Sequence, residues 1–294
     1  TDESLEMALA ADGSYLPARL ALASLLIDAK DLEKAQTLLG AVGPAGKDPR
    51  VQFLLSLLAV HQNDLGKARD ALGGVLTAAP DYGAALALAG EVELRSGNLA
   101  MAEQHLGKAM RQQASAGVRR LLASTQLRQN RPGKAIETLQ PLLQQTGARD
   151  PALSMLAGEA YLANGDVRRA GEYFEAAKAS GSNEAVARTR LGQLALRQGD
   201  VERGEQELVV ASALGTQTTE PDLLLVSLHL RRNEPSKALA AAQAFIKKQP
   251  QNPTGYLLAA AAQTAQQDRA GARASLEAAI KLKPDHVPAL RGLA

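Results

Sequence analysis

The chain has 294 residues, a formal net charge of +2, 46% apolar residues and 22% charged residues, a composition typical of globular proteins. It contains no cysteine, which excludes disulfides, thiolate metal ligands and a cysteine nucleophile. The near-neutral charge provides no general attraction to nucleic acid or anionic lipid. No apolar run approaches the ~20 residues that a membrane span requires.

A segment of about 34 residues repeats along the chain. A small residue recurs at intervals of 33, 34, 33, 35, 34, 34 and 34 residues, and we take it as the anchor of each repeat. The anchors are Ala35, Ala68, Ala102, Ala135, Ala170, Gly204, Ala238 and Ala272. The residues around each anchor recur with the same spacing, so the repeats form a series of similar structural units.

The residues just before each anchor predict a tight turn between two helices. Most positions four residues earlier are Asp or Asn, which accept hydrogen bonds from the first N–H groups of a helix. These are Asp31, Asp64, Asn98, Arg131, Asp166, Asp200, Glu234 and Asp268. Most of the residues that precede them are Gly or Asn, which tolerate the left-handed conformation at a helix end. These are Lys30, Asn63, Gly97, Asn130, Gly165, Gly199, Asn233 and Gln267.

The spacing also predicts how the two helices of a repeat pack. Small residues lie twelve positions before most anchors, where they allow the helices to approach closely: Ala23, Ser56, Gly90, Ala123, Gly158, Gly192, Val226 and Ala260. Apolar residues lie four positions after the anchors, on the same helical face: Leu39, Leu72, Leu106, Leu139, Phe174, Leu208, Ala242 and Leu276. The sequence therefore predicts an all-α fold of helix-turn-helix repeats.

In chain order, we expect a partial helix at 4–11, about eight complete repeats and a further partial helix at 287–294. The repeats are expected near 16–48, 49–82, 83–115, 116–150, 151–184, 185–218, 219–252 and 253–286. They would form one domain over 1–294, a fragment of a longer array because neither end has a capping helix. Residues 41–48 should end a second helix early, Pro141 should kink another, and 215–221 should lengthen a turn.

The segment from Pro151 to Ala179 carries the clearest single copy of the repeat, with Gly158, Tyr161, Ala170 and Phe174 at the diagnostic places. In these residues the chain resembles the tetratricopeptide repeat (TPR) family, although no copy has the family's common early Trp. Pro80, Pro250 and Pro284 match the family's closing proline. The resemblance implies an α-solenoid, a right-handed superhelix of stacked repeats.

No arrangement of residues predicts catalysis. The four histidines, His61, His105, His229 and His286, lie in different repeats and do not share a helical face with a carboxylate at metal-ligand spacing. No phosphate-binding glycine loop or nucleophile motif occurs. We therefore expect neither an enzyme nor a metal site, and no cofactor.

The resemblance implies that the first helices line a concave face that binds extended or helical segments of partner proteins. On that face we expect eight charged residues and three apolar residues to contact a partner. The charged residues are Arg95, Arg128, Arg197, Arg231, Arg120, Arg190, Glu91 and Glu159, and the apolar residues are Phe53, Met155 and Leu223. Because the guanidinium group binds carboxylates in a bidentate way, the partner is expected to be an acidic protein or peptide rather than nucleic acid. Alternatively, the arginines lie where the helix dipole favours cations.

In its Ala-, Gln- and Leu-rich texture the chain resembles the exosortase/PEP-CTERM-associated TPR lipoproteins of Gram-negative bacteria. That resemblance implies a protein-interaction scaffold in exopolysaccharide export, periplasmic or anchored to the outer membrane in its full-length form. The alternatives are a cytoplasmic location and a regulatory or substrate-docking arm of a larger enzyme, such as a TPR-containing glycosyltransferase.

Overall fold

The computed structural model describes residues 2–179, 183–214 and 218–293. Over these residues it contains eighteen α-helices, two short 3-10 helices and no strand, so the predicted all-helical fold is confirmed. The chain forms two compact units, Thr1–Gln145 (unit 1) and Thr146–Ala294 (unit 2). Each is described by itself. The single domain over 1–294, with its eight repeat boundaries, stays a prediction.

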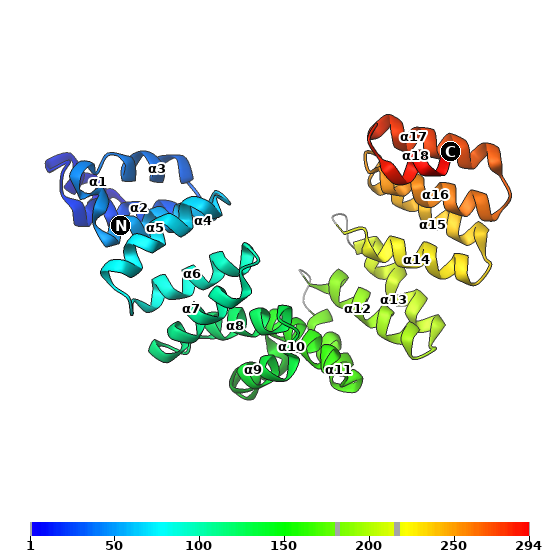
Figure 1. Cartoon of the computed structure of the whole chain (residues 1–294), viewed down its shortest axis with the longest axis horizontal. Helices are drawn as coiled ribbons and strands as arrows, with labels where there is room; N and C mark the ends of the chain where they lie inside the picture. The colour runs from blue at the N-terminus through cyan, green and yellow to red at the C-terminus, as the bar shows by residue number, and fades with distance from the viewer. Residues whose placement is uncertain (1, 180–182, 215–217, 294) are drawn as a thin grey trace. The chain divides into compact units, whose positions relative to one another are not determined.

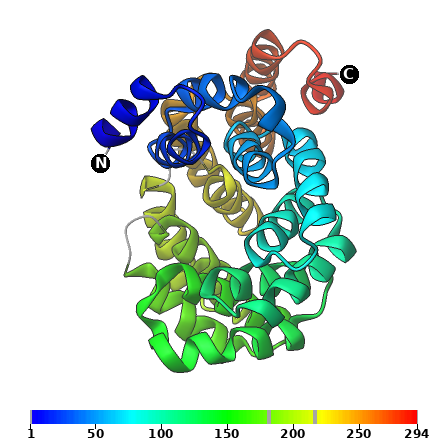
Figure 2. The ribbon, with the colours of Figure 1, turned by 90° about the vertical axis from the view of Figure 1, so that its left-hand side faces the viewer.

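Unit 1 is a stack of antiparallel helix pairs that follow one another in chain order (Figures 1 and 2). Its helices are α1 (Asp2–Ala11), α2 (Leu16–Asp28), α3 (Leu32–Gly40), α4 (Pro49–His61), α5 (Leu65–Ala78), α6 (Gly83–Arg95), α7 (Leu99–Gln112), α8 (Ala116–Arg128) and α9 (Pro132–Thr146). A 3-10 helix, Gly43–Lys47, follows α3. Consecutive cores are each built from three successive helices, for example α4, α5 and α6.

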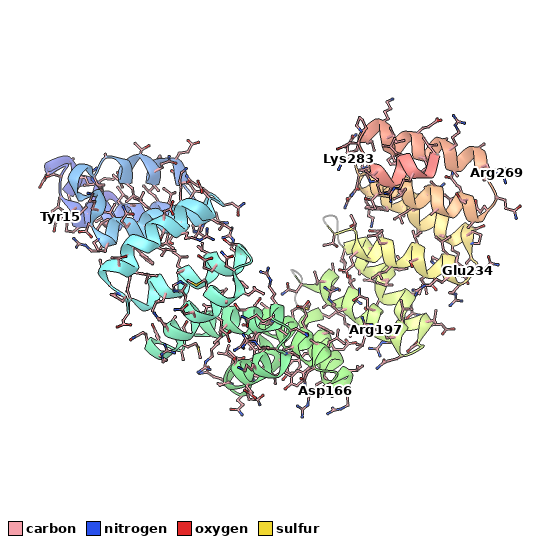
Figure 3. All side chains as sticks on the ribbon, viewed as in Figure 1. Tyr15, Asp166, Arg197, Glu234, Arg269 and Lys283 are labelled. Atoms are coloured by element: carbon pink, nitrogen blue, oxygen red, sulfur yellow. The ribbon has the colours of Figure 1, made fainter. Side chains whose placement is uncertain are left out.

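Unit 2 continues the same arrangement of helix pairs (Figure 1). It begins with a 3-10 helix, Gly147–Arg149. Its helices are α10 (Pro151–Ala163), α11 (Val167–Lys178), α12 (Glu184–Arg197), α13 (Val201–Leu214), α14 (Glu220–Arg231), α15 (Pro235–Lys248), α16 (Pro253–Ala265), α17 (Arg269–Leu282) and α18 (Val287–Leu293). In Figure 3 the labelled Glu234 and Arg269 lie at one edge of the stack and Lys283 at the opposite edge, so turns within repeats and turns between repeats occupy different edges.

The predicted turn within each repeat is confirmed. All eight residues at the predicted left-handed position have a positive φ, between 57° and 85°, including Lys30 and Gln267, whose residue types did not indicate it. The five aspartates at the helix starts accept a backbone N–H three residues on, as Asp166 does from Arg169 at 3.0 Å. Asn98 differs from the prediction because its side chain donates to Glu93 instead of capping α7.

The predicted close approach of the two helices is also confirmed. All eight residues twelve positions before the anchors are buried, and so are all eight apolar residues four positions after them. At Gly158 an added Cβ would lie 2.5 Å from the ring of Phe174, which is fully buried. The missing side chain therefore makes room for the large residue on the partner helix, as close packing of protein interiors requires.

The irregular segments have mixed outcomes. The second helix α3 ends at Gly40, as residues 41–48 predict. Pro141 lies inside the helix α9, which continues to Thr146, and the kink expected there stays a prediction. The predicted longer turn at 215–221 falls partly outside the described residues, and α14 begins at Glu220.

First helices contact the first helices of neighbouring repeats within each unit. In unit 1, α2 contacts α4, α4 contacts α6, and α6 contacts α8; in unit 2, α14 contacts α16. In unit 1 the first helices therefore form one packed layer. In both units we call the side of the first helices that faces away from the second helices the first-helix face. All the residues that the sequence nominates for binding lie on first helices.

Candidate functional site

Two of the three arginines nominated in unit 1, Arg95 and Arg128, bind the preceding repeat. The Nη2 atom of Arg95, at the end of α6, donates to Asn63 Oδ1 at 2.7 Å, and its Nη1 atom lies 3.6 Å from Glu91 Oε1. Arg128, at the end of α8, donates from Nη1 to the carbonyl oxygen of Leu94 at 2.5 Å. Both guanidinium groups therefore already have acceptors within the protein.

Two of the three arginines nominated in unit 2, Arg197 and Arg231, have a different environment. Arg197 ends α12 and Arg231 ends α14, and both side chains are exposed. Among the described residues, neither forms a hydrogen bond or an ion pair. Both line one hollow of about 450 Å³ on the first-helix face, together with Gln193, Leu224 and Leu228. The structure thus brings two cations that have no ion-pair partner among the described residues to the same hollow, whose walls are both polar and apolar.

A charge cluster lies beside this hollow. Arg190 on α12 lies 2.8 Å from Glu220 Oε1 and 3.5 Å from Glu159 Oε1. The amide of Gln193, which lines the hollow, also donates to Glu220 at 2.8 Å. Arg190 and Glu159, both nominated for binding, therefore pair with each other. The cluster of Arg190, Glu159 and Glu220 has a net negative charge. Arg120 lies half-buried on α8 in unit 1.

The apolar candidates do not gather at one place. Phe53 on α4 lines a hollow of about 460 Å³ in unit 1, together with Leu20 and Tyr82. In unit 2, Met155 is half-buried on α10, and Leu223 is 38% exposed in the first turn of α14. Of the three, Phe53 alone lines one of the hollows described in this section.

Sequence reasoning missed two residues of the unit 1 hollow. Tyr82 precedes α6 and its ring meets that of Phe53 edge to face, with centroids 5.3 Å apart. Arg50 lies one helical turn before Phe53, and its guanidinium group pairs with Asp48 at 2.7 Å. This hydrogen bond lowers the pKa of Asp48 to about 2. The available signal was the recurrence of tyrosine just before a first helix, because Tyr15 precedes α2 as Tyr82 precedes α6.

Within the described residues, no cluster of three or more histidine, aspartate or glutamate side chains could hold a metal ion. None of the helices in the described parts of the chain combines the length and the apolar character that would let it cross a membrane.

Two sequence models described as tetratricopeptide repeat match the chain. One covers residues 120–185 and 223–287 and the other residues 3–58, so the matched segments span more than half of the sequence. The chain belongs to the tetratricopeptide repeat family. TPR proteins generally mediate protein–protein interactions and generally lack catalytic activity. No curated protein matches the chain by sequence.

Solved TPR structures share the fold. A tetratricopeptide repeat protein from Parabacteroides merdae superposes with a TM-score of 0.60 at 16% identity, covering 83% of this chain and 97% of that one. PilF of Pseudomonas aeruginosa gives 0.55 at 18% identity, covering 76% and 97%. The human IFIT1 dimer with PPP-AAAA gives 0.52 at 15% identity, covering 92% and 73%. At these identities the likeness concerns the fold alone.

Proposed function

We propose that the chain is a non-enzymatic protein-interaction scaffold whose first-helix face binds an acidic, extended or helical segment of a partner protein. The observation that carries this proposal is the pair Arg197 and Arg231, which lack partners among the described residues and line one hollow of unit 2. A TPR protein with no metal-ligand cluster in its described residues suits binding better than chemistry.

The chemistry of the hollow favours a carboxylate-bearing segment. Each guanidinium group offers a planar fork of donors that matches a carboxylate, and neither group forms an ion pair with an acid among the described residues. Leu224 and Leu228 supply apolar walls beside the charges. Each exposed ion pair contributes about 0.2–1 kcal/mol, so binding requires several contacts and weakens as salt screens the charges. A segment with alternating acidic and apolar residues would offer carboxylates to the two arginines and apolar side chains to the two leucines.

A titration with a fluorescein-labelled peptide of alternating Glu and Leu residues tests this function. The double variant Arg197→Glu with Arg231→Glu should weaken binding by roughly tenfold or more. The matched control is Lys134→Glu with Lys237→Glu, which makes the same charge change on second helices. Equal affinities of the two double variants would reject the arginine pair as the binding site.

The resemblance to exosortase-associated lipoproteins supports a place in exopolysaccharide export, in the periplasm or at the outer membrane. Fractionation of cells that express the full-length protein tests this location, and recovery in the cytoplasm would contradict it. The same binding face would also suit the regulatory or substrate-docking arm of a larger enzyme, such as a TPR-containing glycosyltransferase. The sequence of the full-length gene product distinguishes these two settings.

A further inference from the structure

Unit 1 contains a hollow of about 460 Å³ on its first-helix face. It lies between α2, α4 and the end of α5, and its walls include Leu20, Ala21, Phe53 and Tyr82. Its volume lies within the ~300–1,000 Å³ that is typical of ligand pockets. The walls are almost entirely apolar, so an occupant must present apolar surface.

The aromatic residues of this hollow favour an aromatic occupant. Phe53 and Tyr82 pair edge to face at 63°, and Tyr82 is 43% exposed. Aromatic rings prefer such offset or edge-to-face contacts over parallel stacking. The unpaired sides of the two rings can therefore receive a third ring, and burying that ring also removes the exposed surface of Tyr82 from water.

The charge at the rim favours an acidic residue next to the aromatic one. The side chain of Arg50 lines the hollow and is 65% exposed. Its Nε and Nη2 atoms donate to Asp48, at 3.0 and 2.7 Å. A guanidinium group has five N–H donors, and these two contacts leave three of them for a further acceptor. Arg50 can therefore bind a second carboxylate while it keeps the first.

We propose that this hollow binds an aromatic side chain of a partner protein whose neighbouring residue is acidic. The proposal rests on the proposed function in one respect, namely that the occupant is a protein segment. It does not depend on Arg197 and Arg231, which lie in the other unit. The hollow would select a partner segment for an aromatic side chain, whereas the two arginines would select it for negative charge.

The test uses the whole chain and short fluorescein-labelled peptides that contain Phe-Glu, Ala-Glu or Phe-Gln between Gly and Ser residues. The wild-type chain should bind the Phe-Glu peptide roughly tenfold more tightly than the Ala-Glu peptide, because the ring is buried. The Phe-Gln peptide should bind more weakly than Phe-Glu, because it lacks the charge for Arg50.

The variant Ala21→Leu fills the hollow from an exposed helix position and should abolish the preference for Phe. Ala84→Leu, at an exposed position of α6 outside the hollow, is the matched control and should keep it. Thermal melts of both variants verify folding. Equal binding of Phe-Glu and Ala-Glu, or a preference that survives Ala21→Leu, would overturn the proposal.

Two further outcomes separate this proposal from others. Competition by free p-cresol as strong as by the unlabelled Phe-Glu peptide would identify a site for small aromatic molecules and overturn the assignment to a protein segment. The Arg197→Glu with Arg231→Glu variant should retain the Phe preference. Loss of the Phe preference in that variant would overturn the independence of the two sites. If the wild-type chain shows no Phe preference but its binding of the Glu/Leu peptide still depends on Arg197 and Arg231, the proposal for the hollow fails and the proposed function stands.

Discussion

The guanidinium group of Arg128 donates to the backbone carbonyl of Leu94, which lies 34 residues earlier in the chain. The separation is one repeat, so the bond joins the ends of two successive first helices, α8 and α6. Arg95 makes a related contact with Asn63 in the turn of the repeat before it. In unit 1, cations at the ends of first helices therefore hold neighbouring repeats together.

This contact predicts that Arg128→Ala destabilises the protein. A hydrogen bond with one charged partner contributes about 1.5–3 kcal/mol, and exposure of the Arg128 side chain to solvent reduces this, so we expect a loss of about 1 kcal/mol in the free energy of unfolding. Arg231→Ala, at the equivalent helix end in unit 2, should change it by less than about 0.5 kcal/mol. Urea denaturation followed by circular dichroism measures both. Equal losses in the two variants would contradict the difference in their contacts.

The glycines at the helix–helix contacts predict a second stability effect. A Cβ at residue 158 would lie 2.5 Å from the buried ring of Phe174, so Gly158→Ala should lower the free energy of unfolding by about 1–3 kcal/mol. Gly107→Ala, in the middle of α7 with no atom within 4 Å of the added Cβ, should raise it by about 0.5–1 kcal/mol. Thermal melts that show the same sign for both substitutions would contradict the packing argument.

The fold was predictable from the sequence because its determinants are local. The positive φ values at the turns, the aspartate caps and the small residue opposite Phe174 all follow from residue types at a fixed spacing. Which arginines have contact partners within the protein was not predictable. Where an arginine has a partner, the partner lies about one repeat away, as Asn63 does for Arg95 and Glu220 for Arg190. Such a contact depends on how neighbouring repeats stack. The missed contribution of Tyr82 has the same origin.

The ion pair of Asp222 and Lys248 in unit 2 predicts a larger loss of stability on mutation than loss of an exposed surface charge does. Asp222 is 1% exposed, and its Oδ1 atom accepts from Lys248 Nζ at 2.6 Å. Lys248→Met would leave this carboxylate buried without its cation, which costs about 3–5 kcal/mol. Lys247→Met, at the neighbouring exposed position, is the matched control and should change stability by less than about 0.5 kcal/mol. The double variant Asp222→Leu with Lys248→Met should recover most of the loss in urea denaturation, because no uncompensated charge remains.

The last prediction concerns the dependence of stability on pH. Glu234 binds His229 Nδ1 at 3.0 Å, Arg232 Nε at 3.1 Å and Lys237 Nζ at 3.3 Å. These contacts, above all that with His229, lower the pKa of Glu234 from 4.5 to about 2. A carboxylate with a lowered pKa stabilises the folded state above its unfolded pKa, and this contribution disappears as the pH falls through the folded value.

Glu234→Gln should therefore melt at a lower temperature than the wild-type chain at pH 5–7, and the gap should close between about pH 4.5 and pH 2. Glu202→Gln, on the exposed side of α13, is the control and should produce no comparable gap at neutral pH, since Glu202 forms no ion pair with the described residues. Thermal melts at one-unit pH intervals measure the gap for both variants. A gap for Glu234→Gln that persists unchanged at pH 2 would show that its contacts stabilise the chain without regard to the charge of the carboxylate.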